Sequence, residues 1–166
     1  VIAGGPHCKY YFEDVAKEAW DYVVPWDGER AIVNILAGNA KGRVVRDTMT
    51  KQDILAQPRP DRTSENAKAV IGRYHYVLQG RKATTMMTAR GCPEQCTFCE
   101  DAMTTVKWRS MDNLKREMDD IKSLGYEAVY LFDDIFALAQ KKIGPICDAL
   151  KTRDLIYRCN GQVRYF

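Results

Sequence analysis

Residues 84–99 read T-T-M-M-T-A-R-G-C-P-E-Q-C-T-F-C, a run with strand character that leads straight into three closely spaced cysteines. Cys92, Cys96 and Cys99 form a Cys-x3-Cys-x2-Cys pattern within eight residues. Spacing of this kind is typical of metal ligands. Three thiolates can hold three irons of a 4Fe–4S cluster and leave the fourth iron open to a substrate or cofactor.

Three other uses of these cysteines fit the sequence less well. A zinc site usually takes four ligands from paired knuckles, and Cys147 or Cys159, which could complete one, lie in apolar helix and strand contexts. An electron-transfer ferredoxin site needs a fourth cysteine at a set spacing. A thiol-redox pair would use Cys96 and Cys99 alone and leave Cys92 idle. The spacing therefore favours an open iron–sulfur cluster.

The sequence on both sides of the cysteines predicts alternating strands and helices. Ser110 is a suitable N-cap for a helix over 111–124, whose apolar residues recur at helical spacing. Strands are expected over 84–88, 127–132 and 155–159, with a further helix over 141–151. These β–α steps fit the first half of a β/α barrel over residues 81–166, where chemistry lies at the carboxyl ends of the strands.

The N-terminal part predicts a separate α/β layer over residues 1–47. Residues 1–7 predict a buried strand that runs into a Gly-Gly-Pro-His turn, and a helix over 12–20, a strand over 22–24 and a helix over 30–37 follow. Residues 48–80 change character, and the run Q-P-R-P-D-R over 57–62 is rich in proline and charge. We therefore interpret 48–80 as an interdomain linker that ends in a short strand or hairpin arm.

Composition excludes several classes of protein. The formal net charge is +3 and the charges are mixed, so no basic stripe suggests nucleic-acid binding. No stretch is apolar for long enough to span a membrane. The six cysteines include a metal-type cluster, which favours a reducing, cytoplasmic location over a disulfide framework. Because the chain starts at Val1 and ends straight after a predicted strand, we expect a fragment of a longer protein.

The cysteine pattern, with an aromatic residue directly before the last cysteine, resembles the signature of radical S-adenosylmethionine enzymes. The resemblance implies that Cys92, Cys96 and Cys99 bind a 4Fe–4S cluster whose open iron chelates S-adenosylmethionine. Reductive cleavage would then give a 5′-deoxyadenosyl radical. Phe98 would lie near the adenine, and the Gly-Gly-Glu stretch that often meets the amine is absent here. Asp133 and Asp134 occupy the equivalent strand end, where a helix-capping role is the alternative.

The wider pattern resembles the cobalamin-dependent members of that superfamily. A-R-G-C-P-E-Q-C-T-F-C is followed by W-R-S, a helix with Glu117, and L-F-D-D-I-F. The segments V-I-A-G-G-P-H and W-D-Y-V-V-P-W-D-G-E-R-A-I are similar to the last third of their Rossmann-like cobalamin-binding domain. Of the usual Gly-Glu-Gly-Glu run, only Gly28-Glu29 clearly matches. The implied fold is α/β: the end of that domain, then half of a radical barrel.

The resemblance implies an activity and a set of cofactor contacts. Methyl transfer from methylcobalamin to an unactivated carbon of a small-molecule or natural-product substrate is expected, with flavodoxin or ferredoxin as electron donor. The alternatives are a methylthiolating enzyme without cobalamin and a noncatalytic zinc- or iron-binding module. Gly4 and Gly5 either support the nucleotide tail of cobalamin or form a tight turn. Arg164 either reaches a cofactor carboxylate or is a surface residue, and no catalytic residue is assigned.

Overall fold

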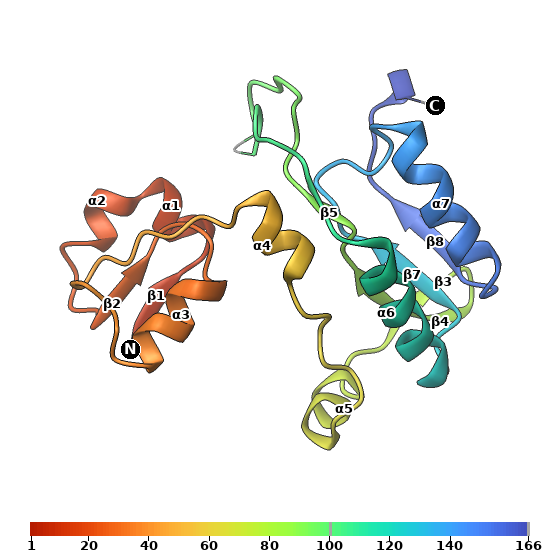
Figure 1. Cartoon of the computed structure of the whole chain (residues 1–166), viewed down its shortest axis with the longest axis horizontal. Helices are drawn as coiled ribbons and strands as arrows, with labels where there is room; N and C mark the ends of the chain where they lie inside the picture. Colours follow the sequence, from red (N-terminus) through yellow and green to blue (C-terminus); the bar gives the residue numbers. More distant parts are fainter. Residues whose placement is uncertain (100, 166) are drawn as a thin grey trace. The chain divides into compact units, whose positions relative to one another are not determined.

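A computed structural model describes residues 1–99 and 101–165 of the chain, which is an α/β protein with mixed sheets (Figure 1). The described residues fall into two compact units, Val1–Asp53 and Ile54–Phe166. The division lies inside the stretch that the sequence suggested as a linker. No helix of the described residues has the length and apolar character needed to cross a bilayer.

The first unit is a small parallel α/β layer. Strand β1 (Ile2–Gly4) pairs in parallel with β2 (Tyr22–Val24), and helix α3 (Glu29–Leu36) follows as predicted. The single helix predicted over 12–20 is wrong. Within that range only a four-residue helix forms, α2 (Phe12–Val15). A separate short helix, α1 (Pro6–Tyr10), precedes it, and Pro6 suits the first turn of that helix. Both helices pack on the sheet through a core of Ala3, Cys8, Val15 and Val23.

The second unit is built on a four-stranded sheet in the order β3-β4-β7-β8. Strand β3 (Tyr76–Leu78) pairs antiparallel with β4 (Arg81–Met86), which confirms the predicted hairpin arm. Strands β4, β7 (Ala128–Leu131) and β8 (Ile156–Cys159) are parallel, with Met86 opposite Leu131 and Leu131 opposite Cys159. Parallel neighbours need crossover connections, and here helices α6 (Met111–Ser123) and α7 (Gln140–Lys151) provide them.

Helix α6 buries the apolar stripe that its sequence predicts. Leu114, Met118 and Ile121 are at most 1% exposed and share one core with residues of β7 and α7. Its first turn is capped as expected, because the Ser110 hydroxyl accepts a hydrogen bond from the Asn113 amide at 3.2 Å. These contacts fix the strand ends from which the cysteine loop and Asp133 depart.

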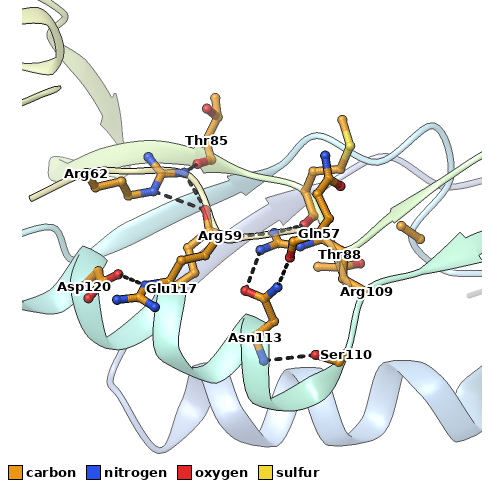
Figure 2. Close-up of polar contacts among 12 residues, drawn as sticks. Gln57, Arg59, Arg62, Thr85, Thr88, Arg109, Ser110, Asn113, Glu117 and Asp120 are labelled. Atoms are coloured by element: carbon orange, nitrogen blue, oxygen red, sulfur yellow. Dashed lines mark hydrogen bonds and ion pairs between the residues drawn. The ribbon is translucent and has the colours of Figure 1, made fainter. Parts of the chain in front are cut away.

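The proposed linker contains more regular structure than its composition suggests. Helices α4 (Lys51–Ala56) and α5 (Glu65–Ile71) both lie within residues 48–80. Between them, residues 57–62 have no regular secondary structure and lie along α6 (Figure 2); we call this segment the strap. Two further short elements frame the cysteines: β5 (Ala89–Arg90), paired antiparallel with β6 (Lys107–Trp108), and the 3-10 turn η1 (Val163–Tyr165).

Candidate functional site

The cysteine loop leaves the carboxyl end of β4 and is closed at its base. Its two sides pair as β5 and β6, with Ala89 opposite Trp108. Gly91 has φ +98°, and a Cβ there would lie 2.4 Å from the backbone oxygen of Thr105. Only glycine therefore lets the two sides of the loop approach this closely.

Hydrogen bonds continue this closure above the base. The Cys92 amide donates to the Thr104 hydroxyl at 2.8 Å, and the Thr104 amide donates to the Cys92 carbonyl at 2.8 Å. The Met103 amide donates to the Glu94 carbonyl, also at 2.8 Å. The first cysteine is thus held by hydrogen bonds on both of its backbone groups.

The three cysteines differ in exposure across the loop. Cys92 is buried, Cys96 is half-buried and Cys99 is exposed, and the Cys99 amide donates to the Cys96 carbonyl at 3.0 Å. Burial, followed by the neighbouring charges of Cys99 and Asp134, raises the pKa of the Cys92 thiol.

The donor set fits a cluster in its chemistry. All three donors are thiols from one short loop, which is the ligand type that iron–sulfur clusters take. Over residues 1–99 and 101–165, no three His, Cys, Asp or Glu side chains converge tightly enough to hold a single metal ion.

Asp133 and Asp134 both contact the junction between β4 and the loop. The Asp133 carboxylate accepts the Thr88 amide at 2.6 Å, the Ala89 amide at 3.2 Å and the Thr88 hydroxyl. It is 1% exposed, and burial raises its pKa despite these bonds. Asp134 is exposed and accepts the Gly91 amide at 2.7 Å. Asp133 is therefore fully engaged within the protein, and Asp134 is the accessible member of the pair.

The segment after β8 folds onto the cysteine loop. Arg164, which the sequence offered as a cofactor contact or a surface residue, forms an ion pair with buried Glu94. The Tyr165 hydroxyl donates to the same carboxylate, and Gln162 Nε2 lies 3.5 Å from Cys96 Sγ. An open pocket of about 600 Å³ lies between the two segments, lined by Pro93, Glu94, Gln95, Cys96, Arg164 and Tyr165.

A buried ionic cluster, which sequence reasoning missed, holds β4 from its other side (Figure 2). Glu117 of α6 is 0% exposed and binds two arginines: Arg62 Nη2 lies 2.7 Å from its Oε1 and Arg109 Nη1 lies 2.6 Å from its Oε2. Arg62 also donates to the Thr85 carbonyl at 2.6 Å, and Arg109 to the Met87 carbonyl at 2.7 Å. A signal was present, since Asn113, Glu117 and Asp120 place polar groups on one side of α6.

The other residues predicted to contact a cofactor, Phe98, Gly4 and Gly5, take no part in the hydrogen bonds and ion pairs described above. The Phe98 ring is 89% exposed on the cysteine loop. Gly4 and Gly5 are in the first unit, where Gly5 has φ +86° and precedes α1, and a Cβ on Gly4 would lie 3.5 Å from the Val24 carbonyl oxygen. The backbone thus explains why Gly5 is a glycine, and a cofactor role for either glycine remains a prediction.

Comparison with known proteins gives distant relatives. The chain is 26% identical to an uncharacterized methyltransferase of Pyrococcus horikoshii, over 100% of the chain and 40% of the relative. It is also 26% identical to an anaerobic magnesium-protoporphyrin IX monomethyl ester cyclase of Rubrivivax gelatinosus, over 93% of the chain and 32% of the cyclase. An uncharacterized methyltransferase of Synechocystis matches at 26% over 91% of the chain and 27% of its own length. No family model matches.

These relatives support a coarse statement about the class of protein. They are named as enzymes, either methyltransferases or a cyclase, and their similarity to this chain is consistent with a distant relationship to the radical S-adenosylmethionine superfamily. The chain spans 40% or less of the length of each of these relatives. What the whole protein does is therefore a matter for proposal.

Proposed function

We propose that this chain carries the cluster-binding part of a radical S-adenosylmethionine enzyme. The observation that carries the proposal is the cysteine loop itself. Three thiols stand on a loop that is closed at its base and held at the carboxyl end of a parallel strand. In β/α enzymes that end of the sheet is where reacting groups gather. The named enzymatic activities of the distant relatives agree with this assignment.

In this proposal each residue of the loop region has a separate task. Cys92, Cys96 and Cys99 would hold a 4Fe–4S cluster, which when bound supplies the electron that cleaves S-adenosylmethionine. Asp134, accessible beside the loop base, is placed to accept a hydrogen bond from a cofactor amine. The exposed Phe98 ring offers an apolar surface that can cover an adenine and exclude water.

The finer part of the proposal is cobalamin-dependent methyl transfer. It is supported by the N-terminal resemblance, by the separate α/β unit Val1–Asp53, and by relatives that are named methyltransferases. In this function the first unit would contact cobalamin near Gly4 and Gly5. The substrate would be a small molecule or natural product, and flavodoxin or ferredoxin would deliver electrons.

Anaerobic reconstitution of the whole protein with iron and sulfide tests the cluster. The wild type should bind about four irons and four sulfides per chain and show a charge-transfer band. Cys96→Ala should lose both, together with cofactor cleavage. Cys147→Ala is the matched control, because Cys147 lies outside the loop, 3.2 Å from the Tyr157 hydroxyl, and should keep the cluster. One bound zinc and no colour would instead support a noncatalytic module.

Cobalamin binding has its own test. Protein purified after growth with cobalamin should carry a bound corrin, visible in its absorption spectrum, in addition to the iron–sulfur band. An intact cluster and cofactor cleavage without any corrin would favour the methylthiolating alternative. That result would reject the cobalamin part of the proposal and leave the radical chemistry standing.

A further inference from the structure

The segment that follows β8 reaches the middle cysteine of the loop. Gln162 Nε2 donates to Cys96 Sγ across 3.5 Å, although the two residues are 66 positions apart in the chain. Both side chains are half-buried. The contact therefore depends on the fold, which places the segment after β8 next to the cysteine loop.

Two neighbouring contacts fix this segment in place. Glu94 lies two residues before Cys96, is 7% exposed and accepts a hydrogen bond from the Tyr165 hydroxyl. Arg164 pairs with the same carboxylate. A buried carboxylate must be paired, since an isolated charge is costly to bury. The pairing anchors residues 162–165, and so holds the Gln162 amide toward the sulfur.

An amide that donates to a cluster sulfur changes the energy of the two oxidation states unequally. Reduction adds negative charge to the cluster and its sulfur ligands, and the positive end of an N–H dipole stabilises that charge. Hydrogen bonds to the sulfurs are among the factors that set the potentials of iron–sulfur clusters. Outer contacts of this kind also orient the ligands.

We propose that Gln162 is a positioning residue that raises the reduction potential of the cluster through Cys96. The inference rests on the proposed function, because it needs a cluster at the three cysteines. On this inference, the side-chain amide of Gln162 contributes to the reduction potential of the cluster. Arg164 and Tyr165 support it by holding the segment against Glu94.

The test is a redox titration of the reconstituted whole protein, followed by electron paramagnetic resonance without S-adenosylmethionine. Gln162→Leu removes the donor, and we expect the ratio of reduced to oxidised cluster at a fixed potential to fall by up to about tenfold, equal to about 59 mV for a one-electron couple. Gln162→Glu removes the donor and adds a negative charge, so its potential should be at least as low. Gln95→Leu is the matched control, because Gln95 is an exposed glutamine beside Cys96.

The possible outcomes separate this inference from the proposed function. Wild-type potentials in both Gln162 variants, with an intact cluster, would overturn the inference alone. Loss of the cluster in both variants, with Gln95→Leu unaffected, would also overturn it, because Gln162 would then be structural. A wild-type protein that binds no iron would overturn the inference and the proposed function together.

Discussion

Replacement of Arg62 by methionine should destabilise the second unit strongly. The Arg62 side chain is 10% exposed and forms hydrogen bonds to Glu117 at 2.7 and 3.2 Å, to the Thr84 hydroxyl at 3.2 Å and to the Thr85 carbonyl at 2.6 Å. Methionine keeps much of the side-chain length and removes every donor. Glu117 then stays fully buried and keeps its ion pair with Arg109.

The size of the effect follows from this burial. Breaking a buried ion pair by removing one partner costs about 3–5 kcal/mol when the other charge is left uncompensated. Arg109 stays 2.6 Å from the Glu117 carboxylate and compensates part of its charge, so we expect a loss at the low end of that range, about 3 kcal/mol. That is a large share of the roughly 5–15 kcal/mol that stabilises a typical domain. Arg59→Met in the same strap is the control: it breaks the pair with Asp120, where both side chains are partly exposed, and should cost about 1 kcal/mol or less.

Native-state hydrogen exchange at the amides of β4 measures the difference. The chain has two compact units, so a single unfolding curve would mix them, whereas these amides report the second unit. The opening free energy should fall by about 3 kcal/mol in Arg62→Met and by about 1 kcal/mol or less in Arg59→Met. Equal losses in the two variants would refute the argument that the buried position of Glu117 sets the cost.

Three further changes test the frame around the site. Gly91→Ala should reduce both thermal stability and iron uptake, because its Cβ would clash with the Thr105 backbone. Gly80→Ala is the control: Gly80 has φ +78° and no atom within 4 Å of the added Cβ, so this variant should show backbone strain alone. Equal losses in the two variants would exclude the clash with Thr105 as the cause. Asp133→Asn can keep the hydrogen bonds to Thr88 and Ala89. Because burial raises the Asp133 pKa, the unfolding free energy of the wild type relative to this variant should fall as pH rises through that pKa. A difference that does not change with pH would contradict this. Ser110→Ala should lower the opening free energy of the α6 amides, measured by native-state hydrogen exchange, by about 1 kcal/mol, and no change would contradict the cap.

Local periodicity explains what the sequence predicted well. The stripe that includes Leu114, Met118 and Ile121 repeats at helical spacing and is buried as a unit, and Ser110 begins that helix. The strand over 127–132 was found for a related reason, since a short apolar run between turn residues suits a buried parallel strand. The strand over 155–159 also formed, although β8 is only partly buried. Each of these signals is contained within one element.

What the sequence did not predict depends on contacts between distant residues. Arg62 and Glu117 are 55 positions apart, and their pairing leaves no period in the sequence. The composition of the strap suggested a linker, and its ion pairs with α6 through Arg59 and Arg62 could not be predicted from that composition. The first unit failed differently. Apolar residues over 12–20 suggested one helix, but Pro6 starts a helical turn earlier, and the observed helices end at Val15.

The buried charges around β4 have a common consequence for the cysteines. Arg62 holds the Thr85 carbonyl, Arg109 holds the Met87 carbonyl, and Asp133 holds the amides that follow. Residues 85–89 are thus bound from two sides just before the loop begins. Metal ligands bind best when their supports fix them in advance. Burying these charges is costly, and they lie where they fix the end of β4. They therefore determine the direction in which the chain enters the cysteine loop and so the position of the first cysteine.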